Sequence, residues 1–262
     1  MTVTTFVEAL QQAYSTQQPI APLTTTNSQL TVAEAYAIQL AQIDARVAQG
    51  DVIVGKKIGL TSRVMQNMFG VTEPDYGHIL QSMVLADGED VSLRTLLQPK
   101  IEFEIAFVLK EDVQGPGVTA EDIVRATDYV VPAFEIIDSR IADWQIRFED
   151  TVADNGSSAY AILGGVPTKL SDVNLATVGM NISRNGHYID HATGAAVMGN
   201  PVEAVAWLAN ALGHYDIALK AGEFVLSGAL TAALPVAAGE TYRADFAHLG
   251  SIQVTFKEES RR

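Results

Sequence analysis

Two glutamates separated by one residue offer the clearest chemistry in this sequence. Glu102 and Glu104 lie in the segment from Pro99 to Leu109, which we expect to form a strand. Because alternate residues of a strand share a face, the two carboxylates lie on one face, with Cα atoms roughly 7 Å apart. Two like charges on a partly apolar wall raise each other's pKa, and a divalent cation removes this conflict. Oxygen-only ligands select a hard ion, Mg²⁺ or Mn²⁺.

The alternative is a solvated strand face whose two glutamates have no special role, and this segment alone favours that alternative. Ala106 and Val108 weaken it, because they share the glutamate face and a solvated face should be more polar. A third carboxylate, Glu135, lies among apolar residues of a second expected strand, where it is costly unless it is paired or binds a metal. We therefore predict that Glu102, Glu104 and Glu135 bind one divalent cation.

A glycine-bracketed lysine pair, Gly55-Lys-Lys-Ile-Gly59, is the second candidate for chemistry. Glycine allows the backbone to approach a ligand, and a desolvated lysine can have a pKa low enough for proton transfer. A surface loop with solvated lysines is an equally good interpretation. Strand alternation sends Lys56 and Lys57 to opposite faces, so only one of them can face a pocket. The five histidines show no metal-ligand spacing and receive no role.

Two further segments, 154–158 and 227–231, combine glycine with hydroxyl side chains. Either could present backbone amides to a carboxylate, although bare turns are the commoner case.

The elements that must position these residues change in character near Gly50. Before it we expect helices over 5–12 and 31–50, the second opened by the capping box of Thr31 and Glu34. After it, short strands predominate, interrupted by helices over 119–127 and after Asn200 and by an Asn185-Gly186 hairpin turn. This clustering favours an α+β fold or β-roll over a doubly wound sheet. We expect a helical subdomain, 1–50, and a β-roll catalytic domain, 51–262. The strands are expected over 52–54, 57–60, 99–109, 129–137, 159–163, 178–183, 224–226, 241–246 and 251–256.

Composition excludes several classes of protein. The net charge of −14 and the lack of a Lys/Arg cluster argue against a nucleic-acid partner. The absence of cysteine excludes disulfides and thiolate zinc sites. No apolar run reaches roughly 18 residues, and no signal peptide precedes the first helix, so we expect a cytoplasmic protein without a membrane partner.

Seven segments carry motifs in order along nearly the whole chain: 57–62, 73–77, 99–104, 132–140, 152–155, 205–209 and 227–231. Together they resemble the 2-keto-4-pentenoate hydratase and 4-oxalocrotonate decarboxylase family of the fumarylacetoacetate hydrolase superfamily. The resemblance implies a mixed β-roll with an N-terminal helical subdomain, a metal bound by Glu102, Glu104 and Glu135, and a homo-oligomer. It implies a 2-oxo acid or 2-hydroxydienoate substrate held through its carboxylate and 2-oxo oxygens.

The same resemblance supplies the remaining candidate residues. Lys57, rather than Lys56, is expected in the pocket, where it would stabilise or protonate a dienolate. Asp75, in the turn 73–77, is a candidate for orienting water, although an aspartate that caps its own turn is equally consistent. Substrate contacts are expected from Leu60 and Thr231 of the matching segments and from Ser158 of the segment 154–158.

The family contains two chemistries that pass through a dienolate, so the resemblance alone does not decide between them. Asp143-Trp144 looks like the hydratase form, whereas 114–119 and 135–140 occur on the decarboxylase side too. We favour a hydratase of the bacterial catabolism of aromatic meta-cleavage products, acting on a substrate of the 2-oxopent-4-enoate or 2-oxohept-4-ene-1,7-dioate type. A 2-oxo-3-hexenedioate decarboxylase is the alternative. A non-catalytic 2-oxo acid binding protein is disfavoured because no metal ligand or pocket lysine is lost, and an acylpyruvate hydrolase because no suitable His-Glu pair appears.

Overall fold

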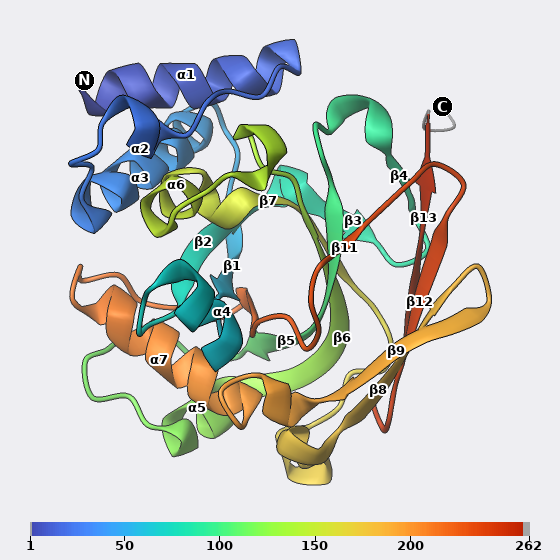
Figure 1. Cartoon of the computed structure of the whole chain (residues 1–262). Coiled ribbons are helices and arrows are strands. Elements are labelled where there is room, and N and C mark those ends of the chain that lie inside the picture. Colours follow the sequence, from blue (N-terminus) through green and yellow to red (C-terminus); the bar gives the residue numbers. More distant parts are fainter. Residues whose placement is uncertain (1, 259–262) are drawn as a thin grey trace.

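The computed structural model describes residues 2–258 and contains two β-sheets flanked by helices (Figure 1). The larger sheet has the strand order β2-β1-β10-β5-β6-β7-β3, with β11 also paired to β5, and the smaller has the order β4-β13-β12-β8-β9. This mixture confirms the α+β prediction. The strands are β1 (Ile53–Gly59), β2 (Asp75–Leu80), β3 (Val84–Ala86), β4 (Asp90–Ser92), β5 (Lys100–Leu109), β6 (Thr127–Ile137), β7 (Ser158–Leu163), β8 (Gly179–Arg184), β9 (His187–Thr193), β10 (Phe224–Leu226), β11 (Leu234–Pro235), β12 (Thr241–Phe246) and β13 (Gly250–Lys257).

The helices gather mainly at two places around the larger sheet (Figure 1). The first three lie with α6 at one end of it, and α5 lies beside α7. Among the described residues 2–258, none of the helices is long and apolar enough to cross a membrane. The helices are α1 (Val3–Thr16), α2 (Leu23–Thr26), α3 (Val32–Ala48), α4 (Arg63–Phe69), α5 (Ala120–Ala126), α6 (Phe148–Ala153) and α7 (Pro201–Gly213).

Strand β5 separates two hydrophobic clusters, as its alternation predicts. The odd-numbered face, including Phe103 and Phe107, packs in the larger cluster. Ala106 and Val108 of the even-numbered face contact the smaller cluster. Glu102 and Glu104 point to the same side as this second face, because side chains alternate along a strand.

The N-terminal helices share their core with the sheets. Phe6, Leu10 and Ile38 belong to the same buried cluster as Phe103 of β5. Gln39 of α3 adds polar connections, because its amide nitrogen donates hydrogen bonds to the carbonyls of Tyr76 and Val152. The boundary between 1–50 and 51–262 stays a prediction.

Several segments differ from the sequence-based expectations. Residues 53–59 form one strand, β1, with a register irregularity between Ile53 and Gly55, instead of two pieces. Helices α2, α4 and α6 were not expected. Asp75 does not lie in a turn but begins the buried strand β2, so the prediction of a turn at 73–77 was wrong for this residue. The Pro-Asp pair suggested a turn, whereas pairing of Asp75 with Gly59 makes it the start of a strand.

The hairpin and helix-start predictions are confirmed. Asn185 and Gly186 have φ of 52° and 78°, the positive values that a type I′ turn requires. Thr31 and Glu34 form the expected capping box at the start of α3, and Asn200 caps α7 before Pro201.

Candidate active site

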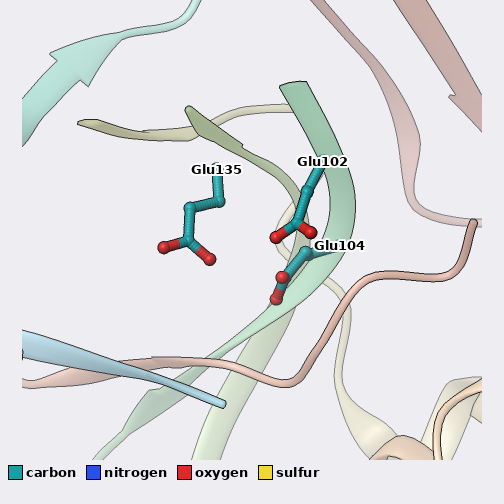
Figure 2. Close-up of side chains that lie close together, drawn as sticks. All are labelled: Glu102, Glu104 and Glu135. Carbon is teal, nitrogen blue, oxygen red and sulfur yellow. The ribbon is translucent and has the colours of Figure 1, made fainter. Parts of the chain in front are cut away.

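Cross-strand register brings the three predicted glutamates together. Glu102 of β5 lies directly opposite Glu135 of β6, and Glu104 follows two residues later on the same face. Each offers one carboxylate oxygen, and these oxygens all lie within 4.8 Å of one another. Figure 2 shows the two β5 carboxylates beside each other and the Glu135 carboxylate facing them across a gap. Like charges opposite one another destabilise a sheet, and protonation or a cation relieves this repulsion.

The hydrogen bonding of these carboxylates fits a metal ion. Glu104 and Glu135 are fully buried. One oxygen of Glu104 accepts a hydrogen bond from the Gly228 amide at 2.7 Å. Its other oxygen and both oxygens of Glu135 have no hydrogen-bond partner in the described chain. Buried carboxylate oxygens without partners are costly, and a hard divalent cation supplies what they lack. The cluster could therefore hold a metal ion.

Burial sets the protonation of the metal-free cluster. It raises the pKa of Glu135 to about 7, although the Lys57 ammonium opposes the shift. Burial and the neighbouring Glu135 carboxylate raise the pKa of Glu104 well above its usual range. Burial also raises the pKa of Glu102. Protons and a cation would therefore compete for these carboxyl groups.

The two adjacent lysines of β1 point to different places, as strand alternation requires. The Lys57 ammonium lies 3.5 Å from a carboxylate oxygen of Glu135 and donates a hydrogen bond to the Gly156 carbonyl at 3.2 Å. Lys56 instead forms a 2.7 Å ion pair with Glu223. Burial lowers the pKa of Lys57, but the carboxylates around it outweigh burial and raise that pKa above its usual value. Lys57 is thus held as a cation beside the glutamate cluster.

Asp75 lies next to Lys57 because β1 and β2 are paired. Asp75 is opposite Gly59 in the register, and a Cβ added to Gly59 would lie 2.0 Å from an oxygen of Asp75. That oxygen is buried without a hydrogen-bond partner in the described chain. Burial raises the pKa of Asp75, and Lys57 opposes this shift. Gly59 therefore leaves the room in which the Asp75 carboxyl group lies.

A pocket of about 550 Å³ lies beside the glutamate cluster, Lys57 and Asp75. Of the predicted residues, Lys57, Asp75 and Glu102 line it, together with Leu60 and Thr231. Glu104 and Glu135 are not among the lining residues and lie buried beside it. Ser158 is not a lining residue either, although its neighbour Ser157 is. The buried Ser158 hydroxyl oxygen has no hydrogen-bond partner in the described chain. The roles of all these residues remain predictions.

Leu60, directly after β1, lines the pocket and has an unusual backbone conformation. Leu60 has φ of 55°, in the left-handed region that costs a non-glycine residue roughly 1–2 kcal/mol. Its carbonyl accepts a 2.9 Å hydrogen bond from the buried Gln66 side chain. Gln66, in the unexpected helix α4, thus holds a conformation that orients pocket residues.

The sequence analysis gave no pocket role to Lys100 or Trp144, yet both line the pocket. The Lys100 ammonium lies 3.9 Å from the centroid of the Trp144 ring, within cation–π range. The alternation that located Glu102 also places Lys100 on its face, two residues earlier, so the signal was present. The buried hydroxyl of Ser227, which lacks a hydrogen-bond partner in the described part, was missed as well.

Comparison with known proteins places this site in a family. The family model "Fumarylacetoacetate (FAA) hydrolase C-terminal" matches residues 63–257. The chain belongs to the fumarylacetoacetate hydrolase family. It is 45% identical over 253 residues to a 2-hydroxyhexa-2,4-dienoate hydratase of Comamonas testosteroni, with 96% of each chain covered. It is 43% identical to a 2-keto-4-pentenoate hydratase of Paraburkholderia xenovorans, with 95% of this chain and 93% of the relative covered. The resemblance expected from the motifs is confirmed.

A solved structure of this fumarylacetoacetate hydrolase family confirms the fold. The 4-oxalocrotonate decarboxylase from Pseudomonas putida G7, complexed with magnesium and adipate, superimposes with a TM-score of 0.94. It shares 38% sequence identity, and the match covers 97% of each chain. The predicted β-roll with N-terminal helices is therefore correct.

Proposed function

We propose that this enzyme is a metal-dependent hydratase that adds water to a 2-hydroxy-2,4-dienoate and yields a 4-hydroxy-2-oxo acid. One observation carries the proposal: a cluster of three glutamates, two of them fully buried, lies with an ammonium and a buried carboxyl group in and beside one pocket. Identity of 45% to a hydratase over almost the whole chain supports it.

The cluster Glu102, Glu104 and Glu135 would hold Mg²⁺ or Mn²⁺, and the magnesium of the decarboxylase structure supports a hard cation. A bound cation supplies Lewis acidity that draws negative charge onto the 2-oxygen of the substrate.

The reaction needs groups that move protons and deliver water. C4 gains the hydroxyl group of water, C3 and C5 each gain one hydrogen, and the 2-hydroxyl group loses its proton. We assign to Lys57 the stabilisation or protonation of the dienolate, since its ammonium is buried and held at the cluster. We assign to Asp75 the orientation of water toward C4, since one of its buried oxygens has no hydrogen-bond partner in the described chain. Leu60, Ser158 and Thr231 would contact the substrate.

A second candidate function is decarboxylation of 2-oxo-3-hexenedioate. The close superposition on 4-oxalocrotonate decarboxylase favours it, because the same fold can carry either reaction. Both reactions pass through a dienolate, so the cluster and Lys57 would serve each.

The deciding experiment incubates the enzyme and Mg²⁺ with 2-hydroxypenta-2,4-dienoate and with 2-oxo-3-hexenedioate in separate assays. We expect loss of the dienoate absorbance of 2-hydroxypenta-2,4-dienoate with formation of the 4-hydroxy-2-oxo acid, and little CO₂ from 2-oxo-3-hexenedioate. Faster release of CO₂ than hydration of any dienoate would show that the enzyme is a decarboxylase. The Glu104→Gln variant serves as the metal-site control in both assays.

Two further features belong to this proposal. A homo-oligomer and a cytoplasmic location are expected from the family resemblance and from the sequence. Light scattering of the purified enzyme measures the number of subunits.

A further inference from the structure

The outer part of the pocket is a wall of apolar side chains from α4. Val64, Met65, Met68 and Phe69 all line the pocket. Their spacing places them on one face of the helix, because residues three to four positions apart are neighbours there. Val64 and Met68 are 71% and 72% exposed. Large apolar side chains that line a pocket and remain this exposed can bury apolar ligand surface.

The charged groups of the pocket come from other elements. The charged lining residues are Lys57 of β1, Asp75 of β2, and Lys100 and Glu102 of β5. None belongs to α4, since Arg63, its one charged residue, is not among the lining residues. The further apolar lining residues include Ile137, Ile146 and Leu230. The pocket therefore has a charged side on the sheet and an apolar side at α4.

Lys100 belongs to the charged side. It lies two residues before Glu102 on the same strand face, next to the glutamate cluster. Its ammonium contacts the Trp144 ring, and no carboxylate oxygen of the described residues lies within ion-pair distance. A cation in this position suits the substrate carboxylate that lies near the cluster. The α4 wall offers nothing comparable to a second carboxylate.

We propose that the α4 face binds the distal end of the substrate and selects a monocarboxylic 2-hydroxydienoate with an alkyl tail over a dicarboxylic one. This inference rests on the proposed hydratase function and narrows it. A second carboxylate placed against Met65 and Phe69 would lose its hydration without gaining a partner. A methyl group there would be transferred from water to an apolar wall, which favours binding about fourfold.

The first test compares three substrates: 2-hydroxypenta-2,4-dienoate, 2-hydroxyhexa-2,4-dienoate and 2-hydroxyhepta-2,4-diene-1,7-dioate. We expect kcat/KM for the six-carbon acid to exceed that for the diacid at least tenfold, since each misplaced or missing group costs such a factor in a specific pocket. In Met65→Ala and Phe69→Ala, the ratio of kcat/KM for the six-carbon acid to that for the five-carbon acid should fall about fourfold. Asn67→Ala is the control, because Asn67 is an exposed α4 residue outside the pocket lining, and its ratio should not change.

A preference for the dicarboxylic substrate would point to a different binding site for the distal end of the substrate. If the wild type prefers the diacid and Lys100→Met removes that preference, Lys100 binds a second carboxylate and the inference is wrong. Equal ratios in the wild type, Met65→Ala and Phe69→Ala would also overturn it.

A binding measurement separates this inference from the proposed reaction. Calorimetry of the Mg²⁺-loaded enzyme with 2-oxohexanoate and 2-oxoadipate needs no turnover. If no dienoate is hydrated, the proposed function fails, but tighter binding of 2-oxohexanoate, weakened in Met65→Ala, still supports the α4 wall. Tighter binding of 2-oxoadipate contradicts it under either function.

Discussion

At the scale of single residues, Glu135 exchanges its proton in a pH range where a cation would compete for the carboxylate. Its folded-state pKa of about 7 lies above the usual glutamate value because the side chain is buried. The folded, metal-free chain therefore binds more protons than the unfolded chain between the two values, and its stability falls as pH rises through about 7. A cation that replaces the proton should stabilise the fold most above that pH.

We accordingly predict that Mg²⁺ raises the Tm much more at pH 8 than at pH 5. Thermal unfolding with EDTA or with excess Mg²⁺ across this range measures the effect. In Glu135→Gln, the rise in Tm caused by Mg²⁺ should be mostly lost, and the pH dependence of that rise should be mostly lost too. The reason is that the glutamine amide neither titrates nor supplies a strong ligand. An equal shift at both pH values would argue against a metal bound by these carboxylates.

Lys57 and Lys56 offer a matched comparison between neighbours. Lys57→Met should lower kcat about 10²-fold or more, the usual contribution of a positioned acid or base. Lys56→Met should leave kcat of the folded enzyme nearly unchanged. It should reduce stability, because it leaves the partly buried Glu223 carboxylate without its ammonium partner. Steady-state kinetics and urea unfolding of both variants separate the effects, and equal losses of kcat would refute the assignment to Lys57.

Asp75 can be tested by separating two steps of the reaction. If it orients water, Asp75→Asn should abolish hydration while leaving solvent hydrogen exchange at C3 of a 2-oxo acid largely intact. Exchange needs the metal and Lys57 but not the attacking water. NMR in D₂O follows exchange, and a coupled assay follows hydration. Parallel loss of both would give Asp75 another role.

At the scale of elements, the pairing of β1 with β2 makes Gly59 a positioning residue for Asp75. Gly59→Ala places a methyl group where an Asp75 oxygen now lies, so the carboxyl group must move. We expect hydration to fall about 10²-fold, as for loss of a positioned catalytic group. In an Asp75→Gly background, the same substitution should cost little. Additive losses in this double-mutant cycle would contradict the contact, because residues that act through one contact are not additive.

The same element scale shows what the sequence could and could not predict. The alternation of β5 predicted both of its faces, including the side on which Glu102 and Glu104 lie. The register that puts Glu135 opposite Glu102 is set by pairing of strands distant in sequence, which local pattern does not encode. Helix α4 had detectable ends, since Ser62 caps it and Gly70 follows in a left-handed conformation. Its apolar residues are helically spaced, but the helix is only 7 residues long, too short for the pattern to stand out.

At the scale of the whole molecule, His78 and Gln39 join the N-terminal helices to the larger sheet. The His78 ring nitrogen Nδ1 lies 3.1 Å from the Gln39 side-chain oxygen. Burial, with a smaller contribution from Lys56, lowers the pKa of His78 to about 3. The unfolded chain therefore binds more protons than the folded chain from about pH 6.5 down to about pH 3, and stability is lost as pH falls through this window.

In His78→Gln, the free energy of unfolding should fall less steeply with decreasing pH. The slope should change by up to about 1.4 kcal/mol per pH unit, the contribution of one proton. Urea unfolding between pH 4 and 7, at a fixed Mg²⁺ concentration, measures the slope for both proteins. The variant need not be more stable, since only the slope tests the assignment. Equal slopes in the two proteins would show that His78 does not control stability in acid. Replacement of His187, which is exposed, is the control and should leave the slope unchanged.

The range matched by the family model begins at residue 63, after β1 has ended. The three glutamates fall inside this shared range, whereas Lys57, Gly59 and Leu60 precede it. A comparison confined to the matched range would therefore include the carboxylate cluster and Asp75, but would omit the lysine, the glycine and the left-handed residue that lie beside them.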